Sequence, residues 1–451
     1  MGIHPDRDNP AMKAVRADRV WFEGAFRDGS AVLVDGSVVA GVVELGAIPA
    51  EAETEDWGDV ALLPGTVNCH GHAFQNLLKG FADDLAFDRW RDEVLYPFSM
   101  SLDGDAIYAG ALFAFAEALA AGVTTTVDFF YLHDASNDNA HQVIRAARDI
   151  GIRLVLARAF YDPDAPTEAP DRYREPAPEA LERLVALGAE FQDDELVSVQ
   201  PAPHSLHAAS PETIAVALEA ASSMDVPCHL HLAEARYEVE QVRARYGTTP
   251  VRLLEREGLL TKDLIAVHGV WLDDEELDLM AAADTALVHC PGANAFLGDG
   301  IARVPEMLRR GIRVALGPDG GCANNRQSVF DEMRMASLVA KARLTDGAAM
   351  DAPSVFALGT SAGGDVLRLP VGEIAVGKAA DLVALDLEDL SLQPLATLER
   401  QVVNSLQSTA IAKTMVAGRV VAENGRPTLV PVQQINEAVA RATQGWRRPA
   451  P

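Results

Sequence analysis

Short apolar segments alternate with longer stretches of helical pattern through the middle of the chain, between residues 64 and 371. Ala-rich and Glu-rich stretches such as 105–121 and 211–223 predict helices between the apolar segments. Four apolar segments are rich in β-branched and aliphatic residues and end in polar side chains, namely 63–72, 228–234, 264–269 and 314–321. This order predicts an α/β protein, a (β/α)₈ TIM barrel whose chemistry lies at the carboxyl ends of the strands.

The two ends of the chain have a different pattern. Residues 15–62 form short alternating strands with glycine turns, and Asp35 followed by Gly36 is a hairpin signal. Residues 376–386 and 411–421 also have strand patterns without a helical period. Because neither end is long enough to close a core alone, we expect both ends to build one small β-sandwich. The predicted domains are a composite β-sandwich of residues 1–63 and 372–451 and a catalytic barrel of residues 64–371.

The polar ends of the four segments include groups that bind metals. His70 and His72 are separated by one residue, so they point to the same side of a strand and can hold one metal ion. A packed pair of core histidines would have the same spacing. The later segments carry His231, His268 and Asp319, and Glu234 follows His231 by three residues.

In this order, the six residues resemble those of the amidohydrolase superfamily, in its mononuclear metal-dependent deaminase branch. The resemblance covers essentially the whole chain. It implies that one divalent ion, Zn²⁺ in first place and Fe²⁺ as the alternative, is held by His70, His72, His231 and Asp319. The stretch 196–201 has no lysine of the kind that bridges two metals in binuclear members, which favours one ion.

The chemistry implied by these residue types is a hydrolysis that releases ammonia. Three imidazoles and a carboxylate leave an open position for water on the ion, whose charge lowers the pKa of that water from about 15.7 to roughly 7. Asp319 would accept the proton of the water, and Glu234 would protonate a ring or imine nitrogen. His268 would polarise the attacked carbon. The predicted enzyme is a hydrolase of carbon–nitrogen bonds other than peptide bonds.

Two subfamilies compete for the substrate. The segments 77–90 and 294–336 are similar to adenosylhomocysteine and methylthioadenosine deaminases, but Ser99 stands where those enzymes carry a ribose-binding glutamate. Other segments resemble formimidoylglutamate deiminase, but His207 stands where that family has an arginine that binds carboxylate. The predicted substrate is therefore a small polar molecule with an amidine-like carbon, either an aminated heterocycle or an N-formimino compound. The expected substrate-binding residues are Gln75, Trp90, Arg91, Tyr131, Arg158, His204 and His207.

Two further histidines, His229 and His289, lie near the predicted site residues in the sequence. His229 has the same parity as His231, and we expect it to pack one layer deeper in the barrel. His289 either lines the pocket or is structural.

An s-triazine chlorohydrolase would keep the barrel but release another leaving group, and such enzymes tend to lose the acid pair that Glu234 and His268 form here. A non-catalytic scaffold on the same barrel would not retain the ligands.

The composition limits which binding partners and which cellular compartment we expect for this protein. The formal net charge of −28, without a basic patch, argues against binding of nucleic acid. No run of eighteen apolar residues predicts a membrane span, and residues 1–8 lack an apolar signal core. The four cysteines show no disulfide spacing, which favours reduced thiols in a cytoplasmic enzyme; they are Cys69, Cys228, Cys290 and Cys322. The family resemblance implies a homo-oligomer, a dimer or larger.

Overall fold

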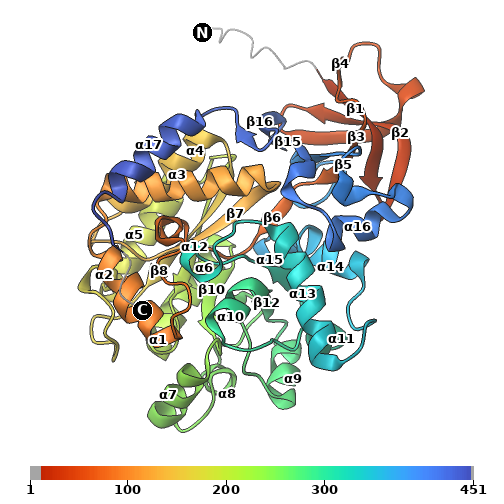
Figure 1. Ribbon diagram of the computed structural model, residues 1–451. Coiled ribbons are helices and arrows are strands. Elements are labelled where there is room, and N and C mark those ends of the chain that lie inside the picture. Colours follow the sequence, from red (N-terminus) through yellow and green to blue (C-terminus); the bar gives the residue numbers. More distant parts are fainter. Residues whose placement is uncertain (1–11, 448–451) are drawn as a thin grey trace, which may run out of the picture.

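Eight parallel strands carry the central part of the chain in this computed structural model, which describes residues 12–447 (Figure 1). They pair in chain order into two four-stranded sheets. The first sheet contains β6 (Thr66–Asn68), β7 (Val123–Phe130), β8 (Arg153–Phe160) and β9 (Val197–Pro203). The second contains β10 (Cys228–Leu232), β11 (Leu264–His268), β12 (Ala286–His289) and β13 (Val314–Leu316).

Hydrogen bonds also join the two sheets at both of their edges. Between β9 and β10, the backbone nitrogen of His231 donates to the carbonyl of His204 at 3.1 Å. Between β13 and the end of β6, the nitrogen of Cys69 donates to the carbonyl of Leu316 at 3.0 Å. The last strand of the succession therefore lies beside the first.

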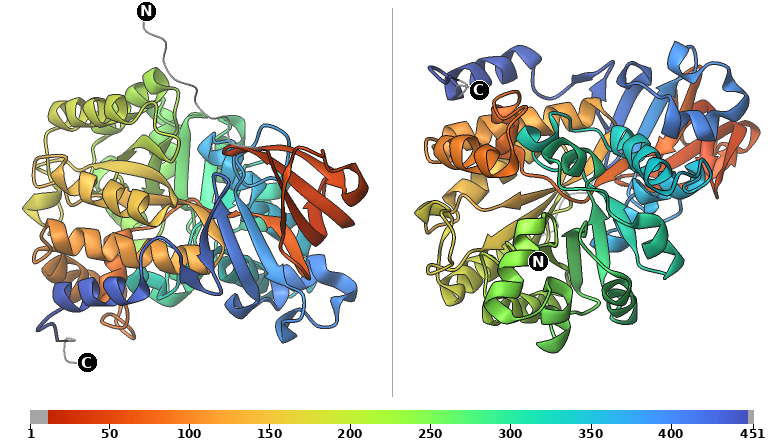
Figure 2. Two further views of the ribbon diagram at one scale, coloured as in Figure 1. Left: turned by 90° about the horizontal axis from the view of Figure 1, so that it is seen from above. Right: turned by 60° about the horizontal axis from the view of Figure 1, so that its bottom comes forward.

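Helices alternate with these strands and surround them (Figure 2). The two predicted helical stretches form α3 (Gly104–Ala120) and α6 (Pro211–Met224), and both begin at a side-chain cap. Asp103 accepts from the nitrogen of Ala106, and Ser210 accepts from that of Thr213. The other helices between strands include α4 (Asp138–Ile150), α5 (Ala177–Glu190), α7 (Arg236–Tyr246), α8 (Pro250–Arg256), α9 (Asp274–Ala282), α10 (Pro291–Leu297), α11 (Val304–Arg309) and α13 (Val329–Leu344).

Strands from both ends of the chain build one nine-stranded sheet. The predicted turn at Gly36 joins two antiparallel strands, β2 and β3. The strand β5 of the amino-terminal part pairs antiparallel with β14 of the carboxyl-terminal part. The sheet contains β1 (Lys13–Phe22), β2 (Ala25–Asp35), β3 (Val38–Glu44), β4 (Glu53–Asp56), β5 (Val60–Pro64), β14 (Leu382–Asp386), β15 (Ile411–Val416), β16 (Arg419–Glu423) and β17 (Arg426–Pro427).

The strand β5 ties this sheet to the central strands. Its side chains alternate, so that Leu62 packs in the apolar cluster of the terminal sheet while Leu63 packs in the large central core. Pro64 ends β5, and Gly65 leads directly into β6. A Cβ at Gly65 would overlap the side chain of Thr124, so the chain passes here only with glycine. The start of the strand that leads to His70 is thereby fixed.

The remaining sequence expectations concern the termini, membranes and thiols. Residues 1–8, which lack a signal-like core, and the outermost bounds of the predicted sandwich domain lie outside the described residues. Within residues 12–447, the structure contains no helix that is both long and apolar enough to cross a membrane. All four cysteines are buried free thiols. The helix α17 (Val432–Ala442) packs against α3 (Figure 1).

Candidate active site

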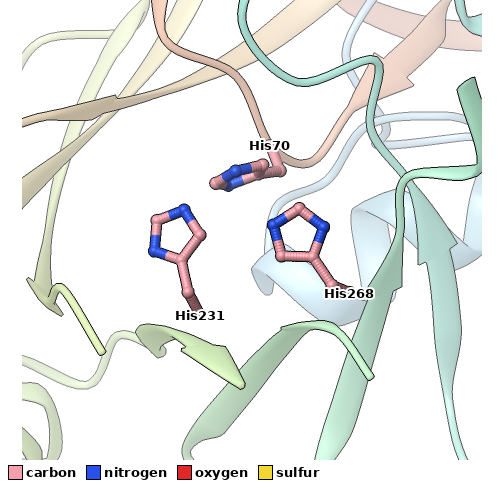
Figure 3. Close-up of side chains that lie close together, drawn as sticks. All are labelled: His70, His231 and His268. Atoms are coloured by element: carbon pink, nitrogen blue, oxygen red, sulfur yellow. The ribbon is translucent and has the colours of Figure 1, made fainter. Parts of the chain in front are cut away.

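Four histidines and one aspartate meet at the carboxyl ends of the central strands, and we call them the floor of the site. The Nε2 atoms of His70 and His72 each lie 3.5 Å from Oδ1 of Asp319. The ring centres of His70 and His231 are 4.8 Å apart, and Figure 3 shows the rings of His70, His231 and His268 converging. The predicted metal ligands therefore come together, with His268 beside them.

The hydrogen bonds of the histidines suit a bound cation. Nδ1 of His72 donates to the carbonyl of Phe129 at 2.7 Å, and Nδ1 of His231 donates to that of His204 at 2.7 Å. Because a carbonyl only accepts, each Nε2 keeps its lone pair for the site. Both ring nitrogens of His70 are buried without a hydrogen-bond partner among the described residues. The donor set therefore fits one divalent ion held by imidazoles and a carboxylate.

Burial keeps these imidazoles neutral, which metal binding requires. It lowers the pKa of His70 well below its usual range, and nearby His231 and His229 lower it further. Burial likewise lowers the pKa of His72 to about 3, with a contribution from His70. The pKa of His231 is also lowered, mainly by burial.

The backbone at two strand ends is strained in a way that aims side chains into the site. His268 has φ of 75° and Asp319 has φ of 68°, in the left-handed region that residues other than glycine rarely adopt. Such conformations cost roughly 1–3 kcal/mol and persist where the surrounding structure enforces them. The nitrogen of Asp319 donates to the carbonyl of His70 at 3.0 Å, which links the two ligand-bearing segments.

Glu234 provides a half-buried acid next to the floor. Its Oε1 lies 3.7 Å from Nε2 of His268, and Oδ2 of Asp319 lies 3.9 Å from the same nitrogen. Burial raises the pKa of Glu234 well above its usual range, and the nearby carboxylates of Asp299, Asp319 and Glu238 raise it further. The raised pKa and the position beside His268 make Glu234 the candidate proton donor of the site.

Asn294 orients His268, and the sequence analysis did not single it out. Its Nδ2 lies 3.2 Å from Nδ1 of His268 and 3.2 Å from Oδ2 of Asp299. Because the amide nitrogen donates to the Asp299 carboxylate, it also donates to His268, whose Nδ1 is then an acceptor. His268 consequently presents its Nε2 hydrogen toward Glu234 and Asp319. Asn294 lies in α10, directly after the strand end of β12, and nothing in the sequence pattern points to it.

A cavity of about 590 Å³ opens above the floor. Six of the seven expected substrate-binding residues line it, namely Gln75, Trp90, Arg91, Tyr131, His204 and His207. Sequence reasoning did not assign five further aromatic residues of the lining to the site: Phe87, Tyr96, Tyr161, Tyr173 and Tyr237. We call the five tyrosines the wall of the site, that is Tyr96, Tyr131, Tyr161, Tyr173 and Tyr237.

Arg158 lies elsewhere, which corrects the expectation that it binds substrate. It is fully buried and pairs with Glu175, and its Nε donates to Oδ1 of Asn137 at 3.0 Å. Asn137 precedes α4 and Glu175 precedes α5, so the side chain points from β8 toward the helices. Arg183 pairs with the same carboxylate. The buried glutamate explains the position of Arg158, because an unpaired buried charge is costly.

The polar groups of the lining already have partners. Gln75 donates to the hydroxyl of Tyr131 at 2.8 Å, and its carbonyl accepts from Cys322 Sγ at 3.1 Å. A Cβ at Gly320 would overlap the Gln75 amide, so this segment needs glycine to pass.

Arg91 is likewise engaged. Its guanidinium donates to both oxygens of Asp92, at 2.7 and 3.0 Å, and lies 5.8 Å from the ring centres of Tyr96 and Tyr237. The lining therefore contains a cation whose charge is already balanced.

Three residues that the sequence left open lie outside the cavity lining. His229 is buried, with Nε2 2.7 Å from Oε1 of Gln200, in the deeper position expected for it. His289 is also buried away from the lining. Ser99 lies behind the wall, with its hydroxyl 2.6 Å from that of Tyr173.

Comparison with known proteins places this arrangement in a family. Residues 61–421 match the model of the Amidohydrolase family. The chain is 34% identical over 418 residues to a 5-methylthioadenosine/S-adenosylhomocysteine deaminase of Syntrophobacter fumaroxidans, covering 92% of each chain. An adenosine deaminase from Xanthomonas campestris, solved with bound zinc, is similar with TM-score 0.88 and 27% identity, over 96% of this chain and 98% of that one.

A second solved structure shares the fold at lower identity. The atrazine chlorohydrolase TrzN from Arthrobacter aurescens TC1 is similar with TM-score 0.89 and 23% identity, over 96% of this chain and 100% of that one. The family model and the deaminase relative cover most of the sequence, and the residues of the floor lie within the matched region. This chain belongs to the amidohydrolase family.

Proposed function

We propose that this protein is a metal-dependent aminohydrolase that removes an amino group from a planar heterocycle and releases ammonia. The observation that carries the proposal is the placement of Glu234, whose pKa is raised by its surroundings, beside His268 and a set of candidate metal ligands in one cavity. The two deaminase relatives, which are named for adenosine-type compounds, support the same reaction class.

The residues proposed to hold the ion are His70, His72, His231 and Asp319. Zn²⁺ is the ion we expect, because three imidazoles and one carboxylate suit it and a zinc-bound relative shares the fold, while Fe²⁺ is the alternative for the same ligands. When bound, a divalent ion lowers the pKa of a water molecule from about 15.7 to roughly 7.

The side chains of the chain divide the proton transfers between them. Asp319 accepts a proton from the attacking water and orients it toward the carbon that carries the amino group. Glu234 gives its proton to the ring nitrogen as the carbon becomes tetrahedral. His268, with its Nε2 hydrogen directed into the site by Asn294, stabilises the developing charge. Asp319 then passes its proton to the amino group, the carbon–nitrogen bond breaks and ammonia leaves, and the hydroxyl proton returns to Glu234 as the carbonyl forms.

The lining favours an aminated heterocycle over an N-formimino amino acid. Phe87, Trp90 and the five wall tyrosines make up much of the cavity lining, and such rings stack on planar ligands. An N-formimino acid needs free cations for its carboxylates, whereas Arg91 is already bound to Asp92. Burial lowers the pKa of His207 to about 3, so this ring adds no charge. Gln75, Trp90, Tyr131, His204 and His207 remain our proposed contacts to the substrate.

We also infer the architecture and setting of the enzyme. The eight linked parallel strands support a (β/α)₈ barrel at residues 64–371, and the nine-stranded terminal sheet supports a small sandwich-like domain from residues 1–63 and 372–451. Four buried free thiols support a cytoplasmic location. Membership of the family supports a homo-oligomer that acts on small molecules.

A screen for ammonia release tests the proposal. The purified protein is incubated with aminated purines, pyrimidines, pterins and triazines, with N-formimino amino acids, and with a chlorinated triazine. We expect ammonia from one or more of the aminated heterocycles. Chloride release without ammonia would favour an s-triazine chlorohydrolase instead. A metal content below about one-tenth equivalent after purification without chelators, together with no turnover, would favour a non-catalytic scaffold.

A further inference from the structure

A buried carboxylate on α13, that of Glu332, lies behind the floor of the site. The residue is 2% exposed, and it takes part in no ion pair within residues 12–447. A buried carboxylate without a cationic partner is costly unless hydrogen bonds replace the water that it has lost. The donors of those hydrogen bonds show which parts of the chain this carboxylate holds together.

The two donors come from the segments that follow the last two central strands. After β12, the backbone nitrogen of Gly292 donates to Oε2 of Glu332 at 2.8 Å. After β13, Nδ2 of Asn324, the last residue of α12 (Gly321–Asn324), donates to Oε1 at 2.8 Å. One carboxylate therefore joins the segments into which β12 and β13 lead.

The packing around these bonds leaves room only for glycine at position 292. A Cβ there would lie 2.4 Å from Oε1 of Glu332 and 2.8 Å from the side-chain amide of Asn324. Glycine is the residue that allows the backbone to approach other groups this closely. The start of α10 is thus packed directly against Glu332 and Asn324.

The bond from Asn324 continues to the turn that carries Asp319. The Nδ2 group of Asn324 also donates to the carbonyl of Pro318, at 2.9 Å. The carbonyl of Asp319 itself accepts from Nε2 of Gln327 at 3.1 Å. Side chains therefore hold the two carbonyls around the left-handed backbone of Asp319. Such a conformation persists only where its surroundings enforce it.

The bond from Gly292 leads to the other proton-handling group, His268. Gly292 is the second residue of α10, and Asn294 lies two residues later on the same helix. Nδ2 of Asn294 is 3.2 Å from Nδ1 of His268. A shift at the start of α10 would therefore move the group that orients His268.

We propose that Glu332 is a positioning residue that fixes Asp319 and His268 relative to one another. It acts on Asp319 through Asn324, and on His268 through the start of α10. Glu332 does not line the cavity, so its effect is on the geometry of the site and not on contacts to the substrate. The inference rests on the proposed metal site and deamination, to which it adds a residue outside the floor.

Glu332→Gln tests this role with almost no change of volume. Glutamine has one acceptor oxygen and one amino group, so it loses the bond from Gly292 or from Asn324 and sets two donors against each other. We expect the dissociation constant for Zn²⁺ to rise by about 10- to 100-fold, the range found for contacts behind metal ligands. Competition with a chromophoric chelator measures this constant. We expect kcat to fall by about 10- to 100-fold, with KM changed by less than about threefold.

Glu276→Gln is the matched control, because Glu276 is also 2% exposed but lies in the cap of α9, outside the cavity lining. Its carboxylate accepts from the hydroxyl of Thr249 and from the backbone nitrogen of Asp273. We expect this variant to unfold at a lower temperature while its Zn²⁺ dissociation constant and kcat stay unchanged. Equal changes in the two variants, or no change in Glu332→Gln, would overturn the positioning role.

Asn324→Ala keeps the proposal testable if Glu332→Gln does not fold. It releases the carbonyl of Pro318 and leaves Glu332 bonded to Gly292. We expect the Zn²⁺ dissociation constant to rise by about tenfold. An unchanged constant in this variant would overturn the path from Glu332 to Asp319. The double variant should raise the constant no further than the stronger single variant, because both act on one carbonyl, and effects that multiply would also overturn this path.

The zinc measurements separate this inference from the proposed reaction. If the screen yields no ammonia while Glu332→Gln weakens Zn²⁺ binding and Glu276→Gln does not, the reaction fails and the positioning role stands. If the protein releases ammonia and Glu332→Gln equals the unmodified enzyme in both constants, the reaction stands and the positioning role is wrong. Unmodified protein that binds no Zn²⁺ would overturn both.

Discussion

The floor and the wall of the cavity are held by different kinds of structure. The floor residues sit at strand ends, where backbone carbonyls fix His72 and His231 and left-handed backbone fixes His268 and Asp319. The wall tyrosines lie on helices and connections, and the hydroxyl of Tyr131 accepts from Gln75 at 2.8 Å. The hydroxyl of Tyr173 meets that of Ser99 at 2.6 Å. The strands thus define the chemistry of the site, whereas the connections define its shape.

The largest expected effect comes from Asp319 in the floor and from Glu234 beside it. Asp319→Asn and Glu234→Gln should each lower kcat/KM by roughly 10²–10⁴-fold, because each removes a proton acceptor or donor in the reaction. Circular dichroism and thermal unfolding should show an intact fold. Glu240→Gln, on the exposed side of α7, is the matched control and should retain full activity. Turnover near the unmodified rate in either acid variant would remove that residue from the mechanism.

The same contrast explains which parts of the molecule the sequence could predict. The floor was predictable because each proposed ligand lies at or just beyond the carboxyl end of an apolar strand, and the carboxyl ends of parallel strands converge. The joint terminal sheet was predictable because neither short set of strands can bury its own apolar face, and Leu62 and Leu63 now pack on opposite sides of β5.

The wall was not predictable from the pattern of the chain. Tyr161 and Tyr173 lie in a connection with no helical or strand period, so nothing in their spacing points them into the cavity. The position of Arg158 was not predictable for a related reason. Its place on β8 does not show which way its side chain points, and only the structure shows that it pairs with Glu175. Asn294 acts through a hydrogen bond to His268 that only the three-dimensional arrangement brings together.

A second expected effect concerns the support behind the wall. Arg158→Met should lower the free energy of unfolding by about 3–5 kcal/mol, because it leaves the buried Glu175 with one partner fewer. The backbone nitrogen of Glu175 donates to the carbonyl of Tyr161 at 2.9 Å, so a displaced Glu175 also displaces a tyrosine of the wall. We therefore expect KM to rise more than kcat falls. Urea unfolding and steady-state kinetics measure the two. Arg148→Met, which removes an exposed pair with Asp194, should cost less than about 1 kcal/mol.

A smaller effect is expected at Asn294, which positions His268 without touching the cavity. Asn294→Leu removes the donor to Nδ1, so the imidazole can place its hydrogen on either nitrogen. We expect kcat to fall by about 10- to 100-fold, the range of second-layer contacts to functional histidines, with little change in KM. Nitrogen NMR of labelled histidine should show a shift in the tautomer of His268. A fall in kcat with an unchanged tautomer would make Asn294 a packing residue only.

The smallest effect is expected at Arg91, and it decides what the wall recognises. Because Asp92 already holds the guanidinium in a two-point contact, Arg91→Met should change KM for a neutral heterocycle by less than about threefold. If the substrate carries a carboxylate bound by this arginine, KM should instead rise by more than about tenfold with little loss of kcat. Measuring both constants for the best substrate of the ammonia screen separates the two. A large rise would mean that substrate binding pulls Arg91 from Asp92, and that the wall contributes charge as well as shape.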